Sequence, residues 1–91
     1  MSLEPNVRTA KATISVRLFA RYAELFGTDS LEVPAEGIDT VANLVERLRA
    51  RPGGGSLGPS TLVAVNLRHA RPDTPVSSDD EVALLPPLAG G

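Results

Sequence analysis

The chain has 91 residues, which predicts a single domain, and 42% of them are hydrophobic, enough for one modest core. Its net charge of −2 lacks the basic excess that is typical of a nucleic-acid-binding protein. Cysteine is absent, so disulfides, thiolate catalysis and cysteine-ligated metals are excluded. The sequence shows neither a signal peptide nor an apolar run of membrane-spanning length, and we expect a cytoplasmic protein with no membrane partner.

The chain begins with a segment that predicts no regular structure. Residues 1–11 are polar and aperiodic, which predicts a disordered N-terminal extension ahead of a domain at 12–85. From residue 13 to residue 19 apolar and polar side chains alternate, which predicts a strand with one buried face. The alternation places Phe19, an aromatic residue, on the face that faces solvent.

A short helix and a second strand follow in the sequence. Residues 20–26 are good helix formers, and Gly27 suits the left-handed position just after a helix end. Residues 30–33 alternate again and predict a strand that Pro34 closes. The short distance between the two strands predicts that they pair antiparallel.

The strongest helix signal begins near residue 40. Apolar residues recur there with the spacing of a single helix face, namely Val41, Leu44, Val45 and Leu48. Asp39 or Thr40 is suited to cap the first turn, and arginines gather at the C-terminal end, where they favour the helix dipole. One apolar stripe predicts that this helix lies on one face of a sheet.

The second half of the chain predicts one loop and three strands. Residues 52–60 are rich in glycine and predict a flexible loop; the glycines follow a helix and precede no Gly-Lys-Ser/Thr, so they do not indicate nucleotide binding. Residues 62–66 predict a strand, and residues 66–68 predict a turn into a short return strand. The final strand is predicted at 82–85.

That last strand runs directly into the segment Pro86–Gly91. Its two prolines fix φ and lack an N–H, so they extend neither a strand ladder nor a helix and predict a stiff exit from the fold. The two closing glycines have no side chain and can pass through a gap too narrow for other residues. We expect a thin arm that presents the α-carboxylate of Gly91 to another protein, with a disordered tail as the alternative.

Two other polar features do not indicate catalysis or metal binding. His69 is the only histidine, and the sequence gives it neither cysteine ligands for a shared metal nor a marked nucleophile that it could activate. The run Asp79–Glu81 has the composition of a solvated turn before a strand. We therefore predict no metal site.

The predicted element order resembles the β-grasp fold of ubiquitin, an α+β fold with a mixed sheet of about five strands and one main helix on one face. Two segments carry a closer resemblance. Val16–Gly27 (VRLFARYAELFG) and Asp79–Gly91 (DDEVALLPPLAGG) look like the opening and the ending of the small subunit of molybdopterin synthase, a ubiquitin-like sulfur carrier of the MoaD/ThiS family. The chain departs from that family in the glycine-rich loop at 52–58 and at Leu67, where a polar residue or glycine is more usual.

The resemblance implies a sulfur carrier whose chemistry takes place at Gly91. A ubiquitin-activating-type adenylyltransferase (MoeB-like) would use ATP to adenylate the Gly91 carboxylate, which would then become a thiocarboxylate. The arm would enter the large subunit of molybdopterin synthase (MoaE-like) and donate sulfur to a pterin precursor in molybdenum cofactor biosynthesis. No bound cofactor is expected, and the catalytic residues are expected in the partner.

Residue parity indicates where the partner docks. If Leu18 and Leu84 point under the helix, Phe19 and Leu85 point to the open face and form an apolar patch at the root of the arm. A histidine is expected beside this patch and two arginines at its rim. The residues predicted to bind partners are therefore Phe19, Arg68, His69, Arg71, Leu85, Pro86, Pro87, Leu88, Ala89 and Gly90.

Other functions share the Gly-Gly ending. A sulfur carrier for thiamine or cysteine biosynthesis would use the same carboxylate activation, although the Leu-Leu-Pro-Pro-Leu-Ala run and the Phe-Ala-Arg segment favour the molybdopterin branch. A ubiquitin-like protein modifier would instead join Gly91 to lysine side chains through isopeptide bonds. A plain binding domain with a frayed tail is the remaining alternative.

Overall fold

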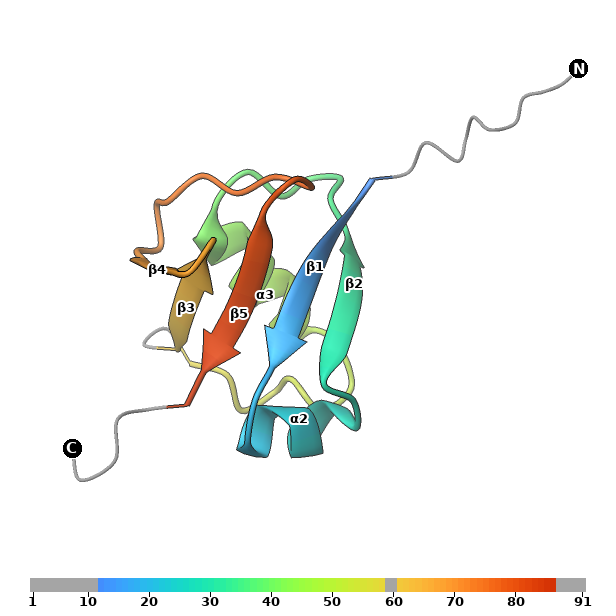
Figure 1. Ribbon diagram of the computed structural model, residues 1–91. Coiled ribbons are helices and arrows are strands. Elements are labelled where there is room, and N and C mark those ends of the chain that lie inside the picture. The colour runs from blue at the N-terminus through green and yellow to red at the C-terminus, as the bar shows by residue number, and fades with distance from the viewer. Residues whose placement is uncertain (1–11, 59–60, 87–91) are drawn as a thin grey trace, which may run out of the picture.

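The computed structural model describes residues 12–58 and 61–86, which form a five-stranded sheet with the longer helix packed on one face (Figure 1). Along the chain the elements are β1 (Thr13–Leu18), α2 (Arg21–Phe26), β2 (Ser30–Pro34), α3 (Val41–Arg49), β3 (Leu62–Val65), β4 (Arg68–Ala70) and β5 (Glu81–Leu85). Neither helix in this part of the chain is long and apolar enough to cross a membrane. The predicted extension at 1–11 and the arm from residue 87 onward lie outside the described residues.

The sheet has the strand order β2-β1-β5-β3-β4, so the first and last strands of the chain are neighbours at its centre. β1 runs parallel to β5 and antiparallel to β2, as predicted for the first two strands. β3 is antiparallel to both β4 and β5. With α3 connecting β2 to β3, this order confirms the β-grasp fold that the resemblance implies.

The core lies between the sheet and α3, and its composition follows from the alternation in the strands. On β1, Ile14, Val16 and Leu18 are at most 2% exposed, and on β5, Val82 and Leu84 are fully buried. The residues between them on each strand point to the other face, which neither α2 nor α3 covers (Figure 1). The sheet therefore has one packed face and one open face, as the sequence predicts.

The start of α3 is fixed by a reciprocal pair of hydrogen bonds. The Thr40 hydroxyl accepts a bond from the backbone N–H of Asn43 at 3.4 Å, while the Asn43 side-chain oxygen accepts one from the backbone N–H of Thr40 at 3.1 Å. This capping box satisfies helix N–H groups that would otherwise lack partners, and it selects Thr40 over Asp39 as the cap. Three of the predicted apolar positions are buried, and Val45 is half-buried.

Gly53, Gly54 and Leu57 of the glycine-rich segment lie against neighbouring elements, which differs from the prediction of a flexible loop at 52–60. A Cβ atom on Gly54 would overlap the carbonyl oxygen of Leu48 near the end of α3, and one on Gly53 would overlap the carbonyl oxygen of Leu25 in α2. Leu57 in the same segment is buried in the core. The glycines allow the loop backbone to lie directly against both helix ends, a role that sequence composition does not distinguish from flexibility.

Candidate functional site

The open face of the sheet carries a groove of about 370 Å³ that follows β5. The residues that line it come from β1, β3, β4, β5 and the positions next to them: Arg17, Phe19, Ala64, Leu67, His69, Glu81, Ala83 and Leu85. We call this surface the docking groove. It brings together three residues predicted to bind a partner, Phe19, His69 and Leu85, although they are far apart in the sequence.

Strand pairing explains why the middle of the docking groove is hollow. Arg17 pairs with Ala83, Ala83 with Ala64, and Ala64 with His69, so the four residues form one row across neighbouring strands. Directly opposed residues project from the same face of a sheet. The two alanines therefore make a low floor, and the longer side chains of Arg17 and His69 rise on either side of it.

The end of the docking groove next to the arm is apolar. Leu18 pairs with Leu84 and both are buried, so the residues that follow them, Phe19 and Leu85, project toward the open face at the point where the chain leaves the sheet. Phe19 is 44% exposed. The structure places both residues where their parity predicts, and their contact with a partner stays a prediction.

The far end of the docking groove was not predicted. Leu67 lies in the turn between β3 and β4 and is 92% exposed, and Glu81 at the start of β5 lies 4.0 Å from the Arg17 guanidinium. Parity alone could have identified Arg17 and Ala83, which lie two residues before Phe19 and Leu85. The remaining groove residues depend on which strands pair, which the sequence does not state.

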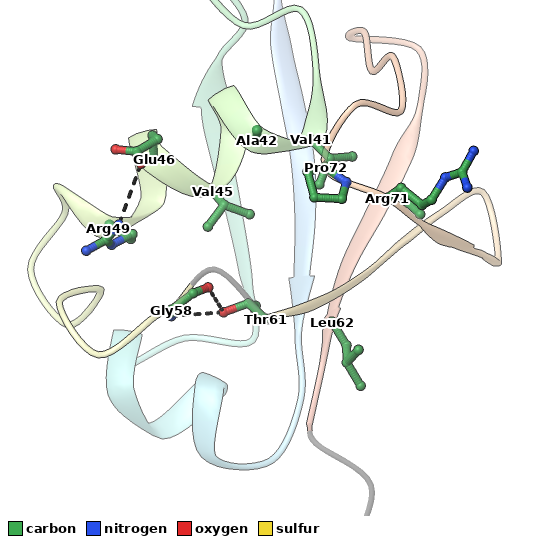
Figure 2. Close-up of a pocket in the computed structure, with 11 residues that line it drawn as sticks. Val41, Ala42, Val45, Glu46, Arg49, Gly58, Thr61, Leu62, Arg71 and Pro72 are labelled. Atoms are coloured by element: carbon green, nitrogen blue, oxygen red, sulfur yellow. Dashed lines mark hydrogen bonds and ion pairs between the residues drawn. The ribbon is translucent and has the colours of Figure 1, made fainter.

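The two arginines predicted at the rim lie elsewhere, which corrects that part of the prediction. Arg68 pairs with Val65, whose side chain is in the core, so Arg68 projects from the helix side of the sheet and His69 from the open side. Arg71 borders a second cavity, of about 360 Å³, between α3 and the β3–β4 edge (Figure 2). One step along a strand reverses the face, so neighbours in sequence do not share a surface.

This second cavity offers few free polar groups. Glu46 and Arg49 on its rim lie 3.5 Å apart as an ion pair, the Thr61 hydroxyl is bonded to the backbone of Gly58, and the Arg71 guanidinium points away from Val45 (Figure 2). Among residues 12–58 and 61–86 no group of three or more His, Asp or Glu side chains is placed to hold a metal ion. The docking groove is therefore the better candidate site.

The open face beside the docking groove is polar. On the β1–β2 side the Glu32 carboxylate accepts hydrogen bonds from the hydroxyls of Thr13, at 2.8 Å, and Ser15, at 2.9 Å. These bonds, the Thr13 bond first, lower the pKa of Glu32 below its ordinary value. Among the described residues, the apolar surface of the open face thus gathers in the docking groove.

A hydrogen-bonded turn fixes the far end of the docking groove. Asn66 donates from its side-chain amide to the Asp80 carboxylate at 2.8 Å and accepts from the backbone N–H of Glu81 at 2.9 Å. Asp80 also accepts from the backbone N–H of Ser77 at 2.8 Å. The Asn66 bond first, and then the Ser77 backbone bond, lower the pKa of Asp80 below its ordinary value.

The lowered pKa of Asp80 predicts a contribution to stability that acid removes. A carboxyl group whose pKa is lower in the folded state stabilises the fold above its unfolded pKa of about 3.9, and this stabilisation disappears as the pH falls through the folded pKa. We expect Asp80→Asn to lower the thermal unfolding temperature at about pH 7 and to approach wild type at about pH 2.5. Thermal unfolding across this range, with Asp79→Asn as the control, measures the effect. If Asp80→Asn lowered the unfolding temperature by the same amount at every pH, this prediction would be contradicted.

The chain is similar to a known protein family and to known proteins. Residues 16–91 match the model of the ThiS family. The chain is 38% identical over 81 residues to the molybdopterin synthase sulfur carrier subunit of Escherichia coli (strain K12), covering 86% of this chain and 99% of that protein.

Two solved structures are similar across the described fold. A putative molybdopterin converting factor subunit 1 from Pyrococcus furiosus has a TM-score of 0.72 and 26% identity, covering 85% of this chain and 99% of that chain. The small archaeal modifier protein 1 of Haloferax volcanii has a TM-score of 0.71 and 27% identity, with the same coverage of 85% and 99%. Because the family match includes the second half of β1, all of the later strands and the Gly-Gly ending, the chain belongs to the ThiS family.

Proposed function

We propose that this protein is the sulfur carrier subunit of a molybdopterin synthase and that Gly91 carries the sulfur as a thiocarboxylate. The observation that carries the proposal is the position of the docking groove, whose apolar end lies where the chain leaves β5 toward its Gly-Gly ending. The 38% identity to a molybdopterin synthase sulfur carrier subunit supports the same function.

The chemistry explains why such a protein needs partners. The Gly91 carboxylate is anionic at neutral pH and has no good leaving group, so sulfur cannot displace its oxygen directly. In adenylation by an ATP-dependent activating enzyme, a carboxylate oxygen bonds to the α-phosphate of ATP and pyrophosphate leaves, which makes a mixed anhydride. Sulfide then forms the C–S bond as the C–O bond to AMP breaks. When the thiocarboxylate gives its sulfur to the pterin precursor and water supplies the oxygen, the carboxylate is regenerated.

The docking groove supplies the binding energy for these encounters. A partner that covers Phe19 and Leu85 buries apolar surface beside the start of the arm, and this positions the arm to enter the partner's catalytic site. The proposed partners are the large subunit of the synthase and the activating enzyme. The carrier acts as a co-substrate, and the groups that catalyse adenylation and sulfur transfer belong to these partners.

Sulfur loading is tested directly by mass. Incubation with the activating enzyme, ATP and a sulfur donor should increase the intact mass by the exchange of one oxygen for one sulfur atom. The loaded protein, mixed with the large synthase subunit and the pterin precursor, should then form the dithiolene product and return to its original mass. An unchanged mass after the first step would contradict the thiocarboxylate, and a stable loaded protein in the second step would contradict the assigned acceptor.

Phe19→Asp tests the docking groove. We expect the dissociation constant for the large subunit to rise by about 30-fold or more, because a charge would replace an apolar contact in the proposed interface at the root of the arm. The thermal unfolding temperature should stay near that of wild type, since Phe19 is 44% exposed and lies outside the core. Titration calorimetry and thermal unfolding measure the two effects.

A matched control places the same charge on the other side of the molecule. Ala42→Asp introduces a carboxylate at an exposed position of α3, on the side of the sheet away from the docking groove, and should leave binding unchanged. Unaltered binding of Phe19→Asp would show that the docking groove is not the interface. Loss of folding in Phe19→Asp would show that its side chain belongs to the core.

A second function is favoured by one specific observation. The similarity to small archaeal modifier protein 1 supports a protein modifier whose Gly91 is joined to lysines of target proteins. Both functions need the same carboxylate activation, so the intact mass of protein from its native host separates them. Exchange of one oxygen for sulfur identifies a carrier, and covalent protein adducts through Gly91 identify a modifier.

A further inference from the structure

Leu67 is poorly suited to its position in the isolated fold. Val65 of β3 pairs with Arg68 of β4, so Asn66 and Leu67 form a two-residue hairpin turn, and their φ angles are 52° and 71°. Two successive positive φ values define a turn in which the second position strongly prefers glycine. Leucine is disfavoured there by its Cβ, and at 92% exposure its side chain gains almost nothing from burial.

The turn nevertheless holds Leu67 in a fixed place. The backbone N–H of Asn66 donates to the Glu81 carbonyl at 2.7 Å, and the Asn66 side chain bonds both Asp80 and the backbone of Glu81. These bonds tie the hairpin to the start of β5. Leu67 is thus an exposed apolar side chain on an anchored turn, and it lines the docking groove at the end opposite Phe19 and Leu85.

We propose that Leu67 is a contact residue for the large subunit of the synthase and enters an apolar depression on that subunit. The inference rests on the proposed function and extends the interface from the root of the arm along the whole docking groove. Leu67 and the apolar end of the groove border one continuous surface, with the Ala64 and Ala83 floor between them. Residues held in disfavoured backbone conformations cluster at binding sites, where a partner makes use of the side chain.

The large subunit is a better match for this contact than the activating enzyme. The Escherichia coli relative is named as a subunit of molybdopterin synthase. Lasting subunit interfaces bury larger and more apolar surfaces than transient encounters do. Activation requires access to the carboxylate of the arm, whereas a stable subunit interface can also cover the opposite end of the groove. We therefore expect Leu67 to contact the large subunit, which covers the whole docking groove, and not the activating enzyme, which needs only the end next to the arm.

Leu67→Gly is the informative variant because glycine should stabilise the turn, while the loss of the leucine side chain removes the proposed contact with the large subunit. We expect the dissociation constant for the large subunit to rise about tenfold. The thermal unfolding temperature should remain at or above that of wild type, because glycine suits a positive φ. Leu67→Met retains an apolar side chain and should bind within about twofold of wild type. The rate of sulfur loading by the activating enzyme should be the same in all three proteins.

Leu67→Asn provides a second test of the same contact, since asparagine also tolerates a positive φ. Binding by Leu67→Gly and Leu67→Asn at the wild-type level would overturn the proposal. A fall in unfolding temperature in both variants would also overturn it, because Leu67 would then serve the fold. Slower loading with unchanged binding would assign Leu67 to the activating enzyme and reject the large subunit. Failure of wild-type protein to bind the large subunit would instead refute the proposed function.

Discussion

Deletion of Gly91 is expected to abolish sulfur loading and to leave the thermal unfolding temperature of the protein unchanged. In the proposed function, activation takes place at the carboxylate that ends the Gly-Gly sequence, and deletion would move this group one residue back along the arm, away from the reacting phosphate in the activating enzyme. Proximity and orientation supply much of the rate of such a transfer, so a displacement of one residue is sufficient to stop it. The fold is unaffected because β5 ends at Leu85.

Gly90→Leu tests the same region by a different route. It keeps the terminal carboxylate and the length of the arm, but it places a side chain in the narrow passage that the two glycines are proposed to enter. We expect loading to be lost in this variant too. Intact mass after incubation with the activating enzyme and ATP measures both variants against wild type.

A protein that lacks residues 2–10 is the control for this pair. It removes sequence from the other end of the chain, ahead of the family match that begins at residue 16, and should be loaded like wild type. Normal loading of the Gly91 deletion would refute the role of the arm. Loss of loading accompanied by a lower unfolding temperature would show that the fold, and not the chemistry, had been changed.

Gly54→Ala is expected to cause a large loss of stability for the addition of a single methyl group to the glycine-rich segment. The Cβ of the new alanine would overlap the carbonyl oxygen of Leu48 near the end of α3. This oxygen belongs to the helix backbone, so it cannot move aside as the end of a flexible side chain could. The loop must then shift away from the helix and partly uncover Leu57, which is buried in the core. Overpacking of this kind costs about 3 kcal/mol, which lowers the unfolding temperature of a domain of this size by roughly 15 °C.

Gly55→Ala is the matched control, because a Cβ at the neighbouring position meets no atom within 4 Å. It should unfold within about 2 °C of wild type, or slightly higher, since alanine restricts the unfolded chain. Equal unfolding temperatures for the Gly54 and Gly55 variants would show that the loop does not pack against α3 as described. Neither variant should alter sulfur loading, because both residues lie outside the docking groove.

Local patterns in the sequence predicted the elements well. Period-two alternation identified β1 and β2 and placed Phe19 on the open face, and the apolar stripe identified α3. These predictions succeed because side-chain direction is set by the backbone geometry of each element and needs no knowledge of its neighbours. The order of these elements resembles the β-grasp fold, and this resemblance implied the mixed sheet with one main helix on one face, which local patterns do not contain.

The structure of three features could not be predicted from local sequence patterns. Arg68 and Arg71 are predicted at the rim of the apolar patch, but the pleat of β4 directs Arg68 to the other face and Arg71 borders the second cavity. The glycine-rich segment at 52–58 was predicted to be flexible, whereas it packs against two helix ends. In each case the outcome depends on how the segment packs against another element, which its own local pattern does not show.

The sequence by itself determined which side chains β1 and β5 bury and that an apolar strand leads into a Gly-Gly ending, because both properties are local. Only the tertiary structure decided that Ala64 and Ala83 pair to form the floor of the docking groove, and that Leu67 stands at its far end on an anchored turn. The physical reason is that a groove is formed between strands. Its shape depends on the register in which β5 pairs with β1 and β3, and the residues of one strand do not specify that register.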